Sequence, residues 1–246
     1  MVTADRWETA QSYERGYWEN FASQIVDGSV SQMDWYKWRA DNLVAKLRDL
    51  NLGHLADGSA RTIEVGCGPV GVSSYFPAAE RVAVDPLEDF YSKNPVLSRL
   101  RDPRVQYRRG VGEALPCEDA QFDLAIIENC IDHVQDMDGV MRELTRVLRP
   151  GGTLYLTVNC RTKLGYVVHR ALANLRLDPG HPHTFTPPRV SRMIESYGYR
   201  VLGTQVDSYL KALREDITSS EMRPRIKAVL GVSEFVTTAF AQKPAA

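Results

Sequence analysis

Short apolar runs alternate with amphipathic or turn-rich stretches along most of this 246-residue chain. Glycine, proline and polar residues bound the runs, and the stretches between them are long enough for the crossovers of βαβ units. The alternation therefore predicts an α/β fold built on a largely parallel sheet. The predicted strands cover 61–66, 81–85, 104–109, 122–128 and 152–159.

One of the intervening stretches has the spacing of an amphipathic helix. Apolar side chains recur every three or four residues from Val140 to Leu148, with charged residues between them. A helix with this spacing buries one face, and the Pro-Gly-Gly run at 150–152 stops it. We expect this helix directly before the strand at 152–159.

The first 55 residues are also predicted to be helical. Apolar and aromatic residues recur at helix-like intervals from Trp35 to Leu50, before Gly53 and a turn at 57–59. This region is interpreted as an N-terminal helical cap or lid (1–55) on a domain that spans 56–246.

An inserted segment is predicted at about 160–188, directly after the strand at 152–159. A helix at 163–175 leads there into a loop at 178–188 that is too rich in proline and glycine to continue it. The elements expected next are a short helix at 190–197, a strand at 199–206, further helix at 208–230 and a last strand at 233–242.

Composition and charge narrow the function classes. A chain with 43% hydrophobic and 25% charged residues can bury a full core as one enzyme-sized domain. Its 30 basic and 31 acidic residues give a net charge of −1, which provides no bulk attraction to phosphate backbones or anionic lipid. Nucleic acid is therefore disfavoured as a partner, and no membrane association is expected.

The four cysteines do not form the pattern of a disulfide framework. They are widely spaced and include no C-x-x-C pair. Together with a polar start and no segment of membrane-spanning length, they suggest reduced thiols and a cytoplasmic enzyme. The oligomeric state stays open between monomer and homodimer. The cysteines are Cys67, Cys117, Cys130 and Cys160.

A glycine-rich loop follows the first predicted strand. Gly66, Gly68 and Gly71 permit a tight turn, close approach of a ligand and close packing of a following helix. Asp85 ends the second strand, nineteen positions after Gly66, where its carboxylate would accept hydrogen bonds from ribose hydroxyls. An NAD(P)-dependent oxidoreductase would show the same glycines and the same acid.

Further sequence motifs favour a different class of enzyme. The run Glu64-Val-Gly-Cys-Gly68 is followed in order by Gly-Val-Gly-Glu-Ala-Leu-Pro at 110–116, Phe-Asp-Leu at 122–124 and Leu-Arg-Pro-Gly-Gly at 148–152. Over roughly 60–160 the chain resembles the class I S-adenosylmethionine (SAM)-dependent methyltransferases, in particular the methyltransferase type 11 group. A carboxylate at Glu64 suits the cationic SAM better than a pyrophosphate.

The resemblance implies a fold, a cofactor and a set of binding residues. The fold would be a Rossmann-like, doubly wound seven-stranded sheet with an antiparallel last strand, and SAM would leave as S-adenosylhomocysteine (SAH). One position departs from the family, because Val111 stands where an acid often holds the adenine amino group. The implied cofactor-binding residues are Glu64, Gly66, Cys67, Gly68, Asp85, Pro86, Gly112, Glu113, Glu128 and Asn129.

Methyl transfer from a sulfonium needs geometry more than reactive side chains. It is an in-line displacement, so the protein must hold the nucleophile near the methyl carbon and exclude water. A general base is required only when the nucleophile has to lose a proton. His133, after the fourth strand, is the candidate base, with a packing role as its alternative. The resemblance also implies that the inserted segment at about 160–188 shapes the substrate pocket. Candidate substrate contacts are Tyr13, Trp18, His181 and His183, and no metal site is expected.

The sequence thus predicts a SAM-dependent methyltransferase that acts on a small molecule. An oxygen nucleophile is slightly preferred, in a natural product, sugar or lipid precursor. The alternatives are an NAD(P)-dependent oxidoreductase and a non-catalytic SAM-binding or partner-binding domain. An RNA methyltransferase is disfavoured by the net charge and by the run at 128–131, which lacks an Asn-Pro-Pro-Tyr type signature.

Overall fold

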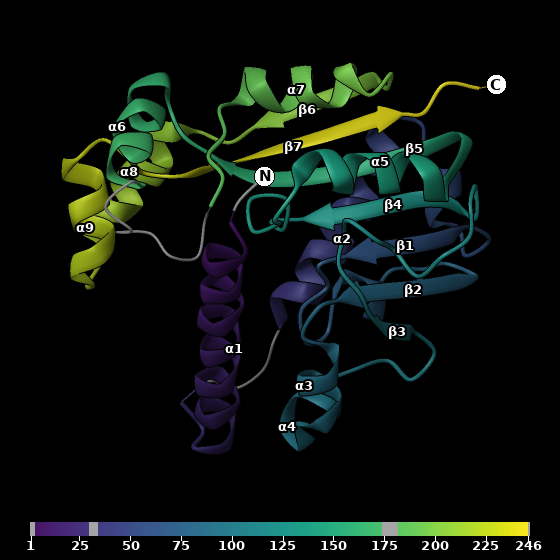
Figure 1. Ribbon diagram of the computed structural model, residues 1–246, viewed down its shortest axis with the longest axis horizontal. Helices are drawn as coiled ribbons and strands as arrows, with labels where there is room; N and C mark the ends of the chain where they lie inside the picture. The colour runs from purple at the N-terminus through teal and green to yellow at the C-terminus, as the bar shows by residue number, and fades with distance from the viewer. Residues whose placement is uncertain (1–2, 30–33, 174–181, 246) are drawn as a thin grey trace.

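A single seven-stranded sheet forms the centre of the molecule (Figure 1). The computed structural model describes residues 3–29, 34–173 and 182–245. The strand order is β3-β2-β1-β4-β5-β7-β6. The strands are β1 (Arg61–Val65), β2 (Glu80–Asp85), β3 (Gln106–Arg109), β4 (Phe122–Glu128), β5 (Leu148–Cys160), β6 (Arg200–Val206) and β7 (Phe235–Gln242).

The directions of the strands confirm the predicted sheet. β1 pairs in parallel with β2 and β4, β2 with β3, and β4 with β5. β7 runs antiparallel to both of its neighbours, β5 and β6. The fold is therefore Rossmann-like, with an antiparallel last strand. The strand order reverses between β1 and β4, and open α/β sheets bind ligands at the carboxyl ends of such strands.

Helices cover both faces of the sheet, because neighbouring side chains of the central strand are buried on opposite sides. Leu124 and Ile126 of β4 pack against α2, whereas Ala125 and Ile127 pack in the cluster that contains α5 and α7. The α-helices are α1 (Ala4–Val26), α2 (Asp34–Asp49), α3 (Glu88–Lys93), α4 (Pro95–Ser98), α5 (Met137–Val147), α6 (Lys163–Ala173), α7 (Pro187–Ser196), α8 (Tyr209–Thr218) and α9 (Met222–Val229).

The two N-terminal helices pack mainly in different clusters of buried residues. Leu43 and Leu47 of α2 belong to the core cluster on one face of the sheet. Trp18 and Phe21 of α1 instead pack in a separate cluster with Tyr36 and with residues of the α3–α4 segment. The helical character predicted for 1–55 agrees with the described residues, and the division into a cap and a domain at 56–246 stays a prediction.

Two predicted helices differ from the structure. The helix expected after the glycine loop is a single 3₁₀ turn at Val72–Ser74, since Pro69 and Pro77 leave no room for regular helix between them. The helix expected at 208–230 is two helices, α8 and α9. The second has Pro224 in its first turn, where a missing N–H costs nothing, so a new helix start is favoured there.

Strand β5 also begins earlier than expected. The predicted strand started at 152, after the Pro-Gly-Gly run, but β5 includes this run and starts at Leu148. Gly151 has a positive φ of 75°, and the pairing with β4 shifts register between Phe122 and Leu124. A glycine kink thus lets the chain turn from α5 directly into the ladder.

In residues 3–29, 34–173 and 182–245, no helix combines the length and the apolar composition needed to cross a bilayer.

Candidate functional site

A cavity of about 390 Å³ lies at the carboxyl ends of β1, β2 and β4, and is called the main cavity here. The glycine loop forms its floor and α1 and α2 cover it. This size falls within the range of pockets that hold small ligands, roughly 300–1,000 Å³. The predicted site residues in its lining are Trp18, Glu64, Gly66, Cys67, Gly68, Asp85, Pro86, Glu128, Asn129 and His133.

The glycine loop is held in a conformation that only glycine fits. Gly66 and Gly68 have φ values of 72° and 61°, in the left-handed region. A Cβ on Gly66 would overlap the Cys130 Sγ, and one on Gly68 would lie 2.8 Å from the Tyr36 hydroxyl. The backbone can therefore turn tightly while other segments, or a ligand, approach it closely.

Asp85 fixes this loop from the end of β2. Its Oδ2 accepts a hydrogen bond from the Gly68 N–H at 2.9 Å, and its Oδ1 accepts one from the Leu87 N–H at 2.8 Å. The residue is 6% exposed, and burial raises the pKa of its carboxyl to about 6. Each carboxylate oxygen has a second lone pair, so the group retains capacity to accept hydrogen bonds inside the cavity.

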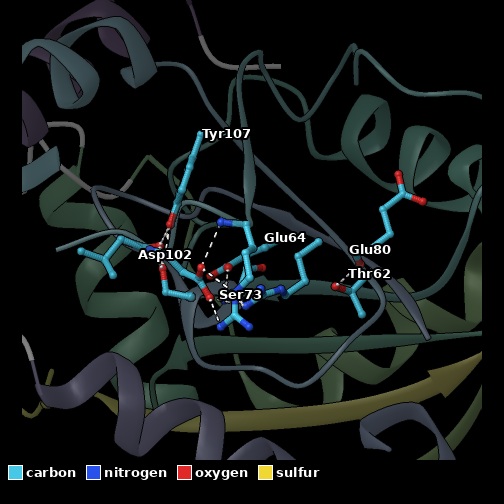
Figure 2. A network of polar contacts seen from close by, with 10 residues as sticks. Thr62, Glu64, Ser73, Glu80, Asp102 and Tyr107 are labelled. Atoms are coloured by element: carbon cyan, nitrogen blue, oxygen red, sulfur yellow. Dashed lines mark hydrogen bonds and ion pairs between the residues drawn. The ribbon is translucent and has the colours of Figure 1, made fainter. Parts of the chain in front are cut away.

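Glu64 supports the segment that follows the loop. Its two carboxylate oxygens accept hydrogen bonds from the N–H groups of Val72 and Ser73, at 2.8 and 2.7 Å. Figure 2 shows Glu64 beside Ser73, in the polar network that also contains Asp102 and Tyr107. Burial raises the pKa of Glu64 to about 7. The carboxylate therefore holds backbone amides while it lines the main cavity.

A buried ion pair supports the same loop from outside, and no sequence motif indicates it. The guanidinium of Arg101 donates to both carboxylate oxygens of Glu88, at 2.8 and 2.7 Å, and its Nε donates to the Pro69 carbonyl at 2.6 Å. It also lies 4.0 Å from the ring centroid of Tyr107. The pair joins three chain segments, so no local spacing reveals it.

The end of β4 presents two buried acceptor groups. Asn129 has a φ of 48°, its N–H donates to the Thr157 carbonyl at 2.9 Å, and its Oδ1 is buried without a hydrogen-bond partner among the described residues. Glu128 Oε1 accepts from the Tyr155 hydroxyl at 3.3 Å, and its Oε2 lies 3.6 Å from Arg39 Nη1. Burial raises the pKa of Glu128.

His133 lies in the loop beyond β4. Its backbone N–H donates to the Cys130 carbonyl at 2.9 Å, and its Nε2 is 3.8 Å from Asp132 Oδ1. Its side chain is 26% exposed and lines the main cavity. An imidazole in this position can exchange protons with a bound molecule.

A second, polar cavity of about 480 Å³ adjoins the main cavity. The two share Arg39, Glu128 and Asn129, so the β4 end lies between them. The far walls of this polar cavity come from α2, β7 and α8, and include Lys46 and Lys211.

An apolar slot of about 40 Å³ extends the main cavity on its other side. Gly112 and Val111 line this slot, and Trp7 of α1 also contributes to its wall. Glu113 is part of the lining too, and its Oε1 accepts hydrogen bonds from the N–H groups of Gln135 and Asp136, at 2.8 and 2.9 Å. The slot and the main cavity share Gly66, Pro86, Cys130 and His133.

Two predicted substrate contacts, Tyr13 and His183, lie elsewhere. Tyr13 is 45% exposed and its hydroxyl accepts a hydrogen bond from Arg223 at 3.2 Å. His183 Nε2 lies 2.8 Å from the Val134 carbonyl oxygen, and burial lowers its pKa. Neither residue lines the main cavity, the polar cavity or the slot. His181 lies outside the described residues.

The main cavity is rich in carboxylates. Of the described residues in its lining, four carry a carboxylate and one, Arg39, carries a guanidinium. Glu14 is the carboxylate that sequence reasoning missed; it accepts a hydrogen bond from Trp18 Nε1 at 2.8 Å. Such a cavity favours a cationic ligand over an anionic one. The other three acids are Glu64, Asp85 and Glu128.

Within the described parts of the chain, no group of three or more histidine, cysteine, aspartate or glutamate side chains is arranged to hold a metal ion.

Comparisons with known proteins agree with this geometry. Residues 63–156 match the family model described as a methyltransferase domain. The chain is 27% identical over 179 residues to the mitochondrial ubiquinone biosynthesis O-methyltransferase of Rattus norvegicus, covering 65% of this chain and 50% of that protein. It is 32% identical over 120 residues to the malonyl-[acyl-carrier protein] O-methyltransferase of Enterobacter lignolyticus, covering 48% and 43%. The chain thus spans half or less of the length of these relatives.

Solved structures share the fold. Phosphoethanolamine N-methyltransferase 2 of Haemonchus contortus, in complex with SAH, superposes with a TM-score of 0.59 at 17% identity, covering 90% of this chain and 58% of that one. The [4+2]-cyclase SpnF superposes with a TM-score of 0.54 at 18% identity, covering 81% and 82%. Because proteins of different activity share this fold, the function must be argued from the site.

Proposed function

We propose that this chain, a member of the class I SAM-dependent methyltransferases, transfers the methyl group of SAM to a small-molecule acceptor. SAM supplies an electrophilic methyl group on a sulfonium and leaves as SAH. The protein provides a shaped cavity and the positions of the two reactants.

The balance of charge in the main cavity carries this proposal. SAM has a sulfonium and an ammonium against a single carboxylate, and four acidic residues against one arginine would lower the energy of such a ligand. A nicotinamide dinucleotide would instead place a pyrophosphate among these carboxylates. That arrangement disfavours the alternative of an NAD(P)-dependent oxidoreductase.

The cofactor residues are assigned from where they lie in the cavity. Asp85 would accept hydrogen bonds from the ribose hydroxyls, and the Gly66–Gly68 backbone with Cys67 would lie against the ligand. Glu64 would attract the methionine ammonium while it holds the loop. The apolar slot beside Gly112 and Glu113 would receive part of the adenine, although its walls, including Val111, are mainly apolar.

The acceptor is proposed to enter through the polar cavity. Glu128 and Asn129 lie between the two cavities, so a methyl group held in the main cavity would face the acceptor there. The unpaired Asn129 Oδ1 and the Glu128 carboxylate would accept hydrogen bonds from a hydroxyl or an amine. Trp18 stays in the proposal as a wall of the site, whereas Tyr13 and His183 would need to move to reach it.

An oxygen acceptor is preferred on chemical and comparative grounds. Two relatives are named as O-methyltransferases, and a hydroxyl must lose its proton for attack, which gives His133 or Glu128 a role as base. His133 is the first candidate. A natural product, sugar or lipid precursor would offer such a hydroxyl.

The direct test is conversion of SAM to SAH. Purified protein is incubated with SAM labelled on its methyl group and with a size-fractionated metabolite extract. We expect the label to move into an extractable small molecule with equimolar release of SAH. Tight SAM binding without turnover on any fraction would instead favour a non-catalytic SAM-binding domain.

A further inference from the structure

The C-terminal helices expose an unusual share of the apolar surface of this protein. Fourteen large apolar side chains are exposed in the described residues, and eight of them belong to α6, α8, α9 and the residue that follows α9. Val229 is 86% exposed, and Met222 and Ile226 lie on the same helical face at four- and three-residue spacing. Leu164 and Val167 of α6 are exposed in the same way.

These three helices gather at one end of the molecule, as Figure 1 shows. α8 packs against α9, and a Cβ on Gly165 of α6 would lie 2.7 Å from the carbonyl oxygen of Gly231, just past α9. α8 has no fully buried residue, and the one buried residue of α9 is Ala228. The described chain therefore leaves the outer faces of these helices uncovered.

The same three helices are also basic. α6 and α9 contain five basic and no acidic residues, and α8 has two of each. The three helices thus carry seven basic against two acidic residues, in a chain whose net charge is −1. Some of the charge is engaged: Lys227 pairs with Glu234 at 2.5 Å, and Arg223 donates to Tyr13. Exposed Lys163 and Arg170 flank the apolar residues of α6.

We propose that α6, α8 and α9 form a docking surface for an anionic lipid bilayer. Helices that expose apolar and basic side chains together lie in the membrane interface, where the apolar groups enter the headgroup region and the cations attract anionic lipid. The protein would rest on the bilayer without spanning it. The expectation of no membrane contact came from the net charge, which does not register this uneven distribution.

A second copy of the chain fits this surface less well. A two-fold contact would place the basic helices of both copies against each other, and like charges in contact repel. An anionic bilayer instead complements both the charge and the apolar side chains. α8 also lines the polar cavity through Lys211, Ala212 and Glu215, so the surface adjoins the proposed acceptor entrance.

The test is co-sedimentation of the full chain with vesicles, and it requires neither cofactor nor acceptor. We expect binding to vesicles of phosphatidylcholine with phosphatidylglycerol, release at high salt, and no binding to phosphatidylcholine alone. Val229→Glu and Arg225→Glu should each weaken the binding by roughly tenfold, because each places a negative charge on the docking surface.

Matched changes away from the surface serve as controls. Val26→Glu alters a valine that is 73% exposed at the end of α1, and Arg192→Glu an exposed arginine of α7. Both should bind like the wild type, and melting curves should show all four variants folded. The proposal is overturned if the anionic vesicles do not bind the wild type, or if the controls lose binding equally. It is also overturned if light scattering shows a dimer that Val229→Glu dissociates while vesicle binding is absent.

Discussion

At the scale of single residues, the site is built from carboxylates that hold the backbone and line the cavity at the same time. Asp85 and Glu64 each accept two backbone hydrogen bonds, and both are buried. The carboxyl groups are therefore held in position before any ligand arrives, and they do not have to move when a cation binds.

Replacing Asp85 tests the proposed ribose contact. Asp85→Ala should weaken SAH binding by about 1.5–3 kcal/mol, roughly tenfold to more than a hundredfold, because hydrogen bonds to a charged group are lost. Calorimetric titration measures this change. Asp89→Ala, which removes an exposed carboxylate paired with Arg109, should leave the affinity unchanged. An unchanged affinity in Asp85→Ala would contradict the assigned contact.

The raised pKa values predict two opposite responses to pH. Burial raises the pKa of Asp85 to about 6 and that of Glu64 to about 7, so both carboxyls gain protons as the pH falls through this range. SAM affinity should therefore decrease from pH 8 to pH 5. For folding, an acid with a raised native pKa contributes stability that is complete below its unfolded pKa and is lost as the pH rises through the native value.

The free energy of unfolding without cofactor should thus decline between about pH 4.5 and pH 7 through Glu64. Glu64→Gln cannot ionise and should flatten this part of the profile, although it costs stability by facing an amide N–H₂ toward backbone N–H donors. Urea titrations at several pH values provide the measurement. A wild-type profile that rises over this interval, and a variant with the same slope, would refute the assignment.

His133 and Glu128 compete for the role of base, and their variants separate the two. If His133 removes the proton, His133→Asn should lower kcat by about 10²–10⁴-fold, because the amide side chain cannot act as a base. SAH affinity should hardly change. Full turnover in His133→Asn, with loss in Glu128→Gln, would leave the histidine structural and make the carboxylate the base.

Residue-level prediction from the sequence succeeded where contacts are local. The motif predicted the tight glycine loop and the acid after β2, because each belongs to one strand and its following turn. Glu14, Trp7 and Arg101 were missed, since they reach the site from segments distant in sequence. The contact of His183 with Val134 likewise depends on tertiary packing.

At the scale of elements, α1 connects stability to the site. Trp18 is 7% exposed, packs edge-on against Phe21 and Tyr91, and lines the main cavity. The helix therefore covers the ligand with a side chain that also anchors it to the α3–α4 segment. Its aromatic spacing indicated a helix but did not distinguish a simple core stripe from a cavity wall.

Two neighbouring aromatic residues of α1 make this testable. Trp18→Ala should lower the free energy of unfolding by about 3–5 kcal/mol and weaken SAM binding, because it removes a buried ring and a wall of the cavity. Tyr17→Ala, at a residue that is 50% exposed, should cost only about 1 kcal/mol. Chemical denaturation compares the two. Equal losses of stability would show that α1 is not anchored through Trp18.

Element boundaries were harder to predict than element types. The strands of the parallel sheet appear as apolar runs, because both faces are covered. The missing helix after the glycine loop and the split of 208–230 depend on prolines whose effect is set by the surrounding chain. Pro224 is compatible with a helix start and with a loop, and tertiary context decided between them.

At the scale of the whole molecule, the order of strands creates the site. The reversal between β1 and β4 brings the ends of β1, β2 and β4 to one edge, where the main cavity and the polar cavity meet. The sequence predicted this architecture through its resemblance to a family. Periodicity alone would have given an α/β sheet without the strand order, because pairing joins distant segments.

Calorimetric titration of the purified chain with SAM, SAH and NADH tests the proposed cationic ligand most directly. We expect SAM and SAH to give saturable heat at one site per chain, with SAM bound more tightly at pH 8 than at pH 5, and NADH to give none. Absence of heat with both SAM and SAH, or saturable binding of NADH in the same cavity, would contradict it.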